Sequence, residues 1–131
     1  VIFLNNRLKQ FELSAGQYPV FMCLLRHPGI TQETMARYFH LDKGTIARTV
    51  KKMEDAGYIS RNVDPANRRA FCLSLTTKGS RLAPEILAID QEWEQVICKD
   101  LSEEEKEQML ALLKHVAESS VQTIRRLEEQ N

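Results

Sequence analysis

The sequence predicts a mainly helical α+β fold that carries one small β-hairpin. Apolar residues recur every three to four positions over most of the 131 residues, whereas residues 58–75 alternate with period two. The composition, 43% hydrophobic and 27% charged, is typical of a globular protein with its own core. We expect a lobe of short helices and the hairpin, residues 14–79, flanked by terminal helical segments at residues 1–13 and 80–131.

Capping residues mark the first two helices of this lobe. Ser14 and Gln17 have the spacing of a capping box, which predicts a helix that starts there and ends at His27-Pro28-Gly29. Thr31 is a good N-cap for a second helix, at about Gln32–Phe39. The two helices are therefore short and separated by a Pro-Gly turn.

A third helix follows after a break of about three residues, and Asp42 is its expected cap. Ile46, Val50 and Met53 recur there at positions i, i+4 and i+7, which makes one apolar stripe. Gly57 is the expected left-handed residue that closes the helix. Because the stripe faces the core, the opposite face of this helix is predicted to be exposed.

The alternating segment predicts the hairpin. Residues 58–63 and 69–75 flank the turn-forming residues 64–68, Asp-Pro-Ala-Asn-Arg. Thr76 or Thr77 then caps a helix that runs to about residue 98. Pro84 lies inside it and is expected to kink the helix or to mark a late start.

The last helix has more apolar surface than a small core can cover. It begins with a second capping box, Ser102 to Glu105. Its near-heptad seam consists of Met109, Leu113, Val116, Ser120, Ile124 and Leu127. We expect this seam to pack against a second copy of the chain in a homodimer, joined by the apolar N-terminal residues Ile2, Phe3, Leu4, Leu8 and Phe11.

The net charge of zero hides an uneven distribution. Residues 1–84 carry 13 basic and 6 acidic side chains, whereas residues 85–131 carry 5 basic and 12 acidic ones. The basic charge of residues 1–84 favours an anionic partner. The alternative is that the charge has no partner and that the acidic C-terminal helices are simply well solvated.

Two short helices, a tight turn and a hairpin follow each other in the order of a winged helix-turn-helix, whose second helix enters the major groove of double-stranded DNA. The candidate DNA-binding residues are Lys43, Thr45, Arg48, Thr49, Lys51, Lys52, Arg68 and Arg69. The first four lie at the helix start, where base edges are reached, and the next two suit phosphates. The two hairpin arginines suit a minor groove, and Gly44 allows a partner's backbone to approach closely.

Four blocks of the sequence also resemble a known family. They are Leu41–Arg48, Met53–Arg61, Asp64–Ala70 and Leu75–Gly79, and in this order and spacing they are similar to the MarR family of winged helix-turn-helix transcriptional regulators. The resemblance covers about residues 13–79 at the level of motifs. The rest of the chain matches in helix layout.

This resemblance implies a cytoplasmic, dimeric regulator that binds a pseudo-palindromic operator. It implies a repressor that a small, often aromatic, ligand releases from DNA, although no ligand-binding residue is indicated. Arg69 is the position carried over as the minor-groove arginine, with Arg68 beside it. Asn67 stands where the family usually has an acid that braces these arginines, but its side chain can still accept a hydrogen bond.

Two alternatives stay open. A winged helix can serve as a protein–protein interaction module, which would need an apolar outward face on the third helix. A thiol-based redox-sensing regulator would use Cys23, Cys72 or Cys98, of which Cys23 is expected to be buried. Their odd number and wide spacing favour a reducing, cytosolic setting.

No catalytic, cofactor or metal motif is present, since the three histidines lack metal-ligand spacing. No apolar run is long enough to span a membrane. We therefore expect neither an enzyme nor a membrane protein.

Overall fold

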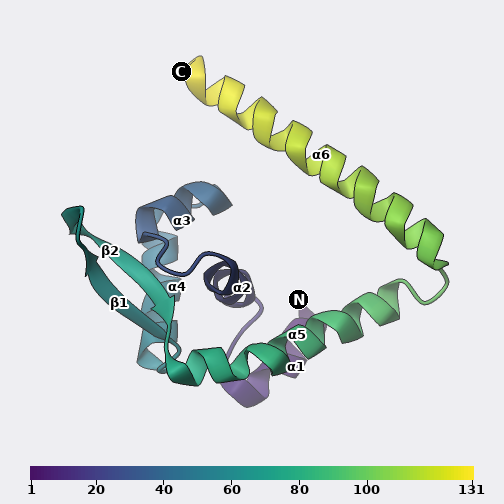
Figure 1. The fold of residues 1–131 in the computed structure, drawn as a ribbon, viewed down its shortest axis with the longest axis horizontal. Coiled ribbons are helices and arrows are strands. Elements are labelled where there is room, and N and C mark those ends of the chain that lie inside the picture. Colours follow the sequence, from purple (N-terminus) through teal and green to yellow (C-terminus); the bar gives the residue numbers. More distant parts are fainter. The chain divides into compact units, whose positions relative to one another are not determined.

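The structure is a computed structural model that describes all 131 residues. They form two compact units, residues 1–90 and residues 91–131, and each unit is described by itself (Figure 1). In chain order the elements are α1 (Ile2–Leu8), a 3-10 turn (Lys9–Phe11), α2 (Tyr18–Arg26), α3 (Gln32–Phe39), α4 (Lys43–Asp55), β1 (Ile59–Asp64), β2 (Asn67–Leu75), α5 (Thr77–Ile97) and α6 (Glu103–Glu129). The predicted class, mainly helical with one antiparallel hairpin, is confirmed.

The caps of α3 and α4 lie where the sequence predicts them. The Thr31 hydroxyl accepts a hydrogen bond from the Thr34 backbone N–H at 3.1 Å. One Asp42 carboxylate oxygen accepts the Thr45 backbone N–H at 2.8 Å. Each cap satisfies a donor that the first turn of a helix leaves without an intrahelical partner, so α3 and α4 start sharply.

The predicted start of α2 at Ser14 is wrong. The helix begins at Tyr18, and its cap position, Gln17, makes no side-chain capping bond. Only half of a capping box forms, because the Gln17 side chain accepts the Ser14 backbone N–H at 3.0 Å while the Ser14 hydroxyl caps nothing. Residues 14–17 instead form a separate turn, and Pro19 then occupies the first turn of the helix, where proline is tolerated.

The core of the first unit lies against the apolar stripe of α4. Ile46, Val50 and Met53 are fully buried, as predicted, and pack in one cluster with residues of α2, α3 and β2. Burying this stripe fixes which way the opposite face of α4 points.

Both chain segments outside residues 14–79 contribute to the same core. Leu8 of α1 and Ile86 of α5 are fully buried in it, and Leu82 and Ile89 of α5 are buried in it as well. The compact units divide at residue 90, and the functional division at residues 13 and 80 stays a prediction. The expected dimerisation role of the terminal segments stays a prediction.

The hairpin is longer than the sequence suggests. Its strands pair from Ile59 with Leu75 to Asp64 with Asn67, with a register irregularity near the tip. Only Pro65 and Ala66 are left outside the strands, since Asn67 and Arg68 already belong to β2. The Asp64 carboxylate accepts the Ala66 N–H at 2.9 Å and holds this tight turn.

The base of the hairpin is bonded to the segment that leads into α3. The Gly29 N–H donates to the Leu73 carbonyl at 2.8 Å, and the Leu73 N–H donates to the Ile30 carbonyl at 2.9 Å. These two bonds extend the sheet toward the Thr31 cap. The start of α3 and the root of the hairpin are therefore held together.

The start of α5 follows the prediction. The Thr76 hydroxyl accepts the Gly79 N–H at 3.1 Å and donates to the Gly57 carbonyl at 2.5 Å. Gly57 itself is left-handed at φ 85°, as expected for the residue that closes α4. The helix begins at Thr77 and continues past Pro84, so the proline does not mark a late start.

The second unit consists of the end of α5 and the long helix α6. The predicted capping box is complete, because Ser102 and Glu105 each bond to the backbone N–H of the other, at 3.1 and 3.0 Å. No residue of α6 is buried within the chain. None of the helices in the structure combines the length and apolarity needed to cross a membrane.

Candidate nucleic-acid interface

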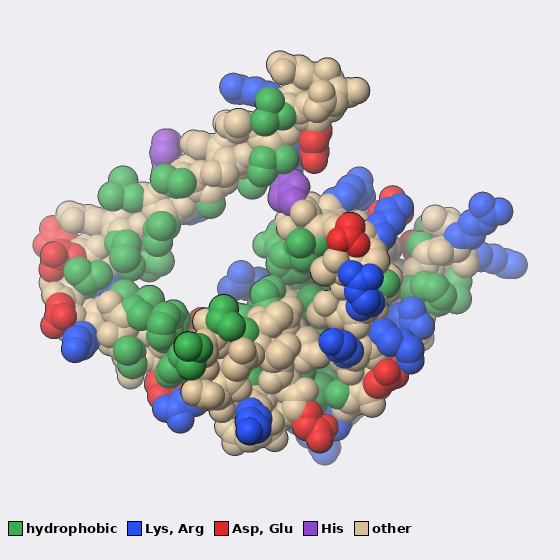
Figure 2. All heavy atoms as spheres, turned by 180° about the vertical axis from the view of Figure 1, so that it is seen from behind, with side chains coloured by type: hydrophobic (Ala, Val, Ile, Leu, Met, Phe, Trp, Pro, Cys, Tyr) green, Lys and Arg blue, Asp and Glu red, His purple; other side chains and the backbone are tan.

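The outward face of α4 carries donors and positive charge. Lys43, Arg48, Lys51 and Lys52 are exposed on it. Figure 2 shows Lys and Arg side chains gathered over the part of the first unit that contains α4 and the hairpin. Such a local concentration of cations attracts an anionic polymer even when the whole chain has no net charge.

The first turn of α4 contains a chain of three connected side chains. The Thr45 hydroxyl donates to the Asp42 carboxylate at 2.5 Å and accepts from the Arg48 guanidinium at 3.2 Å. The hydrogen bonds that Thr45 donates to Asp42, from its hydroxyl group and from its backbone N–H, lower the pKa of Asp42. The carboxylate is therefore ionised near neutral pH and attracts the Arg48 guanidinium.

The Thr49 hydroxyl is also occupied within the helix. It donates to the Thr45 carbonyl at 3.0 Å, and the side chain is only half-exposed. Its oxygen still has a free lone pair, so toward a base edge it would act as an acceptor while this bond lasts.

Two of the candidate lysines have acidic partners, and one does not. Lys43 lies 3.6 Å from Glu33 of α3, and Lys51 lies 2.8 Å from Asp55, whose hydrogen bond raises the pKa of the lysine. Exposed pairs of this kind contribute little stability, so a phosphate can replace the carboxylate at low cost. The Lys52 ammonium group has neither a hydrogen bond nor an ion pair within the chain.

The hairpin tip, the wing of the fold, presents two arginines. Arg68 and Arg69 are exposed, and their guanidinium groups have no partner within the chain. Asn67 acts on the backbone instead, since its side-chain oxygen accepts the Arg69 N–H at 3.1 Å. Asn67 thus shapes the tip without bracing either guanidinium.

Another arginine connects the wing to α4. The Arg61 guanidinium of β1 bonds to Glu54 at 2.9 Å and lies over the Phe71 ring at 4.9 Å from its centroid. The sequence does not single out Arg61, because its position beside Phe71 of β2 becomes evident only once the hairpin is formed. This contact ties the wing to the end of α4.

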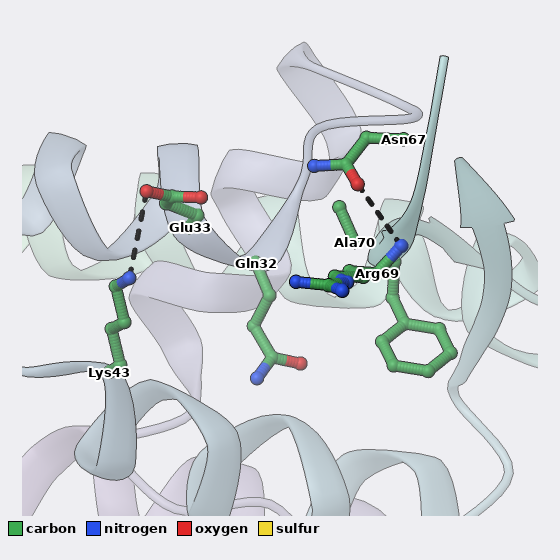
Figure 3. A pocket seen from close by; sticks show the side chains of 7 residues that line it. Gln32, Glu33, Lys43, Asn67, Arg69 and Ala70 are labelled. Carbon is green, nitrogen blue, oxygen red and sulfur yellow. Dashed lines mark hydrogen bonds and ion pairs between the residues drawn. The ribbon is translucent and has the colours of Figure 1, made fainter. Parts of the chain in front are cut away.

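A cavity of about 340 Å³ lies between the starts of α3 and α4 and strand β2 (Figure 3). It brings together Lys43 and Arg69, which the sequence analysis places in separate elements. Gln32 also lines the cavity, and its buried side-chain oxygen has no hydrogen-bond partner. The full lining is Gln32, Glu33, Lys43, Asn67, Arg69, Ala70 and Phe71.

Sequence reasoning missed Gln32, Glu33 and Phe71 as members of this site. Gln32 and Glu33 follow the Thr31 cap, so the sequence already places them in the first turn of a helix. That position could have indicated them as candidates. Lys51 and Lys52 do not line the cavity, since they lie two turns farther along α4.

The cysteines are free thiols with different exposure. Cys23 is buried, as expected, and burial raises the pKa of its thiol. Cys98 is also buried, whereas Cys72 is half-buried on β2. No group of three or more His, Cys, Asp and Glu side chains is arranged to hold a metal ion.

Comparison with known proteins identifies the family. The sequence model of the MarR family matches residues 13–71. The chain is 33% identical over 112 residues to YybA of Bacillus subtilis, described as an uncharacterized HTH-type transcriptional regulator, covering 86% of this chain and 75% of the relative. The chain belongs to the MarR family.

Solved structures of the MarR family support the same assignment. A MarR transcriptional regulator from Methanosarcina mazei Go1 aligns with a TM-score of 0.91 and 30% identity over 93% of this chain and 88% of that one. S. aureus MepR, solved in complex with DNA, aligns with a TM-score of 0.78 and 31% identity over 89% and 87%. This MarR-family chain is therefore a DNA-binding transcriptional regulator with a winged helix, and not an enzyme.

Proposed function

We propose that this regulator binds a specific, pseudo-palindromic operator as a homodimer, with α4 in the major groove and the wing in the adjacent minor groove. The observation that carries the proposal is the arrangement of the first unit. It combines exposed donors at the start of α4 with two unpartnered arginines at the wing tip. That S. aureus MepR is known in complex with DNA favours the same partner here.

Each candidate residue has a proposed role. Lys43, Thr45, Arg48 and Thr49 serve the base-reading end of α4, and Lys51 and Lys52 contact phosphates. Arg68 and Arg69 enter the minor groove, where negative potential is concentrated in narrow A·T-rich stretches.

The homodimer is supported by the exposed apolar face of α6. Leu113, Val116 and Leu127 of the seam are each more than half exposed within the single chain, at 56%, 61% and 56%. Figure 2 shows hydrophobic side chains along this helix. A two-fold interface would place two copies of α4 about 34 Å apart, one turn of DNA, which matches half-sites of a palindrome.

We further propose repression that a small aromatic acid relieves. The cavity beside the wing supports this chemistry, since Lys43 and Arg69 offer cations for a carboxylate and Phe71 offers a ring face. Lys43 and Arg69 are also proposed DNA contacts. A bound acid would therefore compete directly with the nucleic acid.

The alternatives have less support. A protein–protein module needs apolar side chains on the outward face of α4, and that face carries lysines and an arginine. A thiol sensor needs an accessible, acidic thiol, whereas two of the three thiols are buried and the pKa of Cys23 is raised.

The test compares Arg48→Ala with Arg81→Ala, an exposed arginine on α5 outside the proposed interface. Affinities are measured for a selected operator duplex and for a random duplex. Arg48→Ala should lower the preference for the operator by about 5- to 150-fold, the value of one good base contact. Arg81→Ala should leave the preference unchanged, and equal losses on both duplexes for Arg48→Ala would refute base reading.

The ligand proposal is tested separately with benzoate, the simplest aromatic acid. It should weaken operator binding by the wild type, and less so by Arg69→Ala after that variant's lower affinity is taken into account. Equal weakening by acetate at the same ionic strength would show a salt effect only and would contradict the ligand proposal.

A further inference from the structure

We propose that Gly44, Thr45 and Asp42 position Arg48 for base reading, and that Gly44 is a glycine because a side chain there would displace the arginine. This inference rests on the proposed role of Arg48 in operator recognition and adds three positioning residues to it. Asp42 and Gly44 need not touch DNA, and Thr45 gains a positioning role beside its proposed place at the base-reading end of α4.

The first support is the way in which Thr45 uses its hydroxyl group. Its hydrogen is donated to one Asp42 carboxylate oxygen at 2.5 Å, and its oxygen accepts from Arg48 at 3.2 Å. The other Asp42 oxygen accepts the Thr45 backbone N–H at 2.8 Å. Thr45 is thus fixed by two bonds to the helix cap and holds the guanidinium from a fixed point.

The second support is the close approach of two side chains to Gly44. A Cβ atom at this residue would lie 3.1 Å from a carboxylate oxygen of Asp42 and 3.2 Å from a guanidinium nitrogen of Arg48. Both distances are tighter than ordinary van der Waals contact. The arginine therefore lies back over the first turn of α4, across the position that any other residue would fill.

This arrangement accounts for a glycine in an unfavourable place. Glycine inside a helix costs about as much backbone entropy as any residue can, so the first turn of α4 would be more stable with alanine. The φ angle of Gly44 is not in the left-handed region, so the backbone does not require glycine there. Close approach of the Asp42 and Arg48 side chains is the local feature that favours glycine.

The consequence for recognition is preorganisation. An exposed arginine samples many rotamers, so it loses conformational entropy when it binds a base edge. An arginine that is already held in one rotamer loses less entropy on binding. The guanidinium lies toward the N-terminal end of α4, which is the end of a recognition helix that reaches base edges. Holding it there favours the operator over random DNA, where no base edge matches the fixed position.

The experiment measures the ratio of random-duplex to operator dissociation constants, together with the thermal unfolding temperature. Gly44→Ala should lower the ratio by about threefold or more, as part of the contact's value is lost. Its unfolding temperature should stay close to that of the wild type, because alanine's better helix propensity offsets the crowding of the Asp42 cap. A loss of discrimination without a loss of stability is a result that damage to the fold does not produce.

Thr45 variants provide the matched control. Thr45→Val keeps the shape but removes the hydroxyl group, so it should lower the ratio, whereas Thr45→Ser keeps the hydroxyl and should restore most of it. Thr45→Val should have little effect in an Arg48→Ala background, because the hydroxyl then has no guanidinium to position. If valine and serine behave alike, or if Thr45→Val lowers the ratio as much without Arg48 as with it, the hydroxyl does not position Arg48 and the inference is wrong.

A double mutant distinguishes positioning from direct contact. Gly44→Ala should have little further effect in an Arg48→Ala background, because its target is absent. Additive losses would show that Gly44 acts independently of Arg48 and would overturn the inference while leaving the DNA-binding function intact. A higher ratio for Gly44→Ala would also overturn it, since Arg48 would then be held away from the bases.

One result would remove the basis of the inference. If Arg48→Ala leaves the ratio unchanged, Arg48 does not read bases, and both its proposed role and its positioning by Gly44 fail together. Continued operator preference in that variant would then point to other residues of the proposed site.

Discussion

Asn67 shows how a side chain at the wing tip acts on the backbone and not on a neighbouring charge. The MarR pattern usually has an acid here, whereas Asn67 bonds to the Arg69 backbone N–H and makes no contact with a guanidinium. The wing arginines are therefore unpaired before DNA binds, and no ion pair has to break when they enter a groove.

Arg69→Ala should lower operator affinity and abolish a preference for A·T-rich flanks, because narrow minor grooves concentrate the negative potential that this arginine reads. Arg69→Lys should restore only part of the affinity, since an ammonium is more strongly hydrated than a guanidinium. The measurement uses duplexes that share the operator core and differ only in the flanks. A wild type without flank preference, or an Arg69→Ala variant that keeps it, would contradict this role.

Lys52→Ala should weaken binding to operator and random duplexes alike. It should also flatten the plot of log affinity against log salt by about one unit, because one fewer phosphate is neutralised. Lys114→Ala makes the same change of charge on α6 and should have neither effect. A loss confined to the operator would instead assign Lys52 to base recognition.

At the scale of elements, local chemistry was predictable and longer-range packing was not. Thr31, Asp42 and Ser102 cap helices as the sequence predicts, since a cap depends on residues within one turn. Ser14 fits the same pattern and fails, because residues 14–17 form a turn of their own before α2 begins at Tyr18.

The candidate site shows the same division. The six candidate residues on α4 could be proposed from the spacing of its buried stripe, and Arg68 and Arg69 from their place at the hairpin turn. The cavity that joins Lys43 to Arg69 could not, because it depends on how the hairpin packs beside α3. The hydrogen bonds that connect Asp42, Thr45 and Arg48 depend on side-chain rotamers, which the spacing of residues does not determine.

The junction between the hairpin and α5 depends on a second glycine. A Cβ atom at Gly79 would lie 2.5 Å from the Tyr58 backbone carbonyl oxygen, a contact that only a backbone shift can relieve. Gly79 is also buried, unlike its neighbour Ser80.

Gly79→Ala should therefore destabilise the protein by about 1–3 kcal/mol, in spite of alanine's better helix propensity. Chemical denaturation measures the change, and Ser80→Ala serves as the control, with an expected change near zero. An unchanged or increased stability of Gly79→Ala would show that α5 adjusts its approach to β1 freely.

At the scale of the whole molecule, we expect different roles for the acidic second unit and the basic first unit. The cations that suit DNA lie in residues 1–84, and α6 leaves its apolar residues exposed. An exposed apolar face of this length on one helix favours a partner surface.

Val116→Glu should convert a homodimer into monomers at micromolar concentration, because it places a charge in the seam. Sedimentation velocity measures the state, and Lys114→Glu, an exposed charge change outside the seam, should leave the dimer intact. A wild type that sediments as a monomer at the same concentration would rule out the seam as a dimer interface.

The central claim is that two copies of α4 and its wing read one operator. Selection of bound sequences from a library of random duplex DNA tests it most directly. We expect enrichment of a two-fold symmetric site, with half-sites about 10 base pairs apart between centres and A·T-rich flanks. Enrichment of an asymmetric single site, or of no sequence at all, would contradict the account.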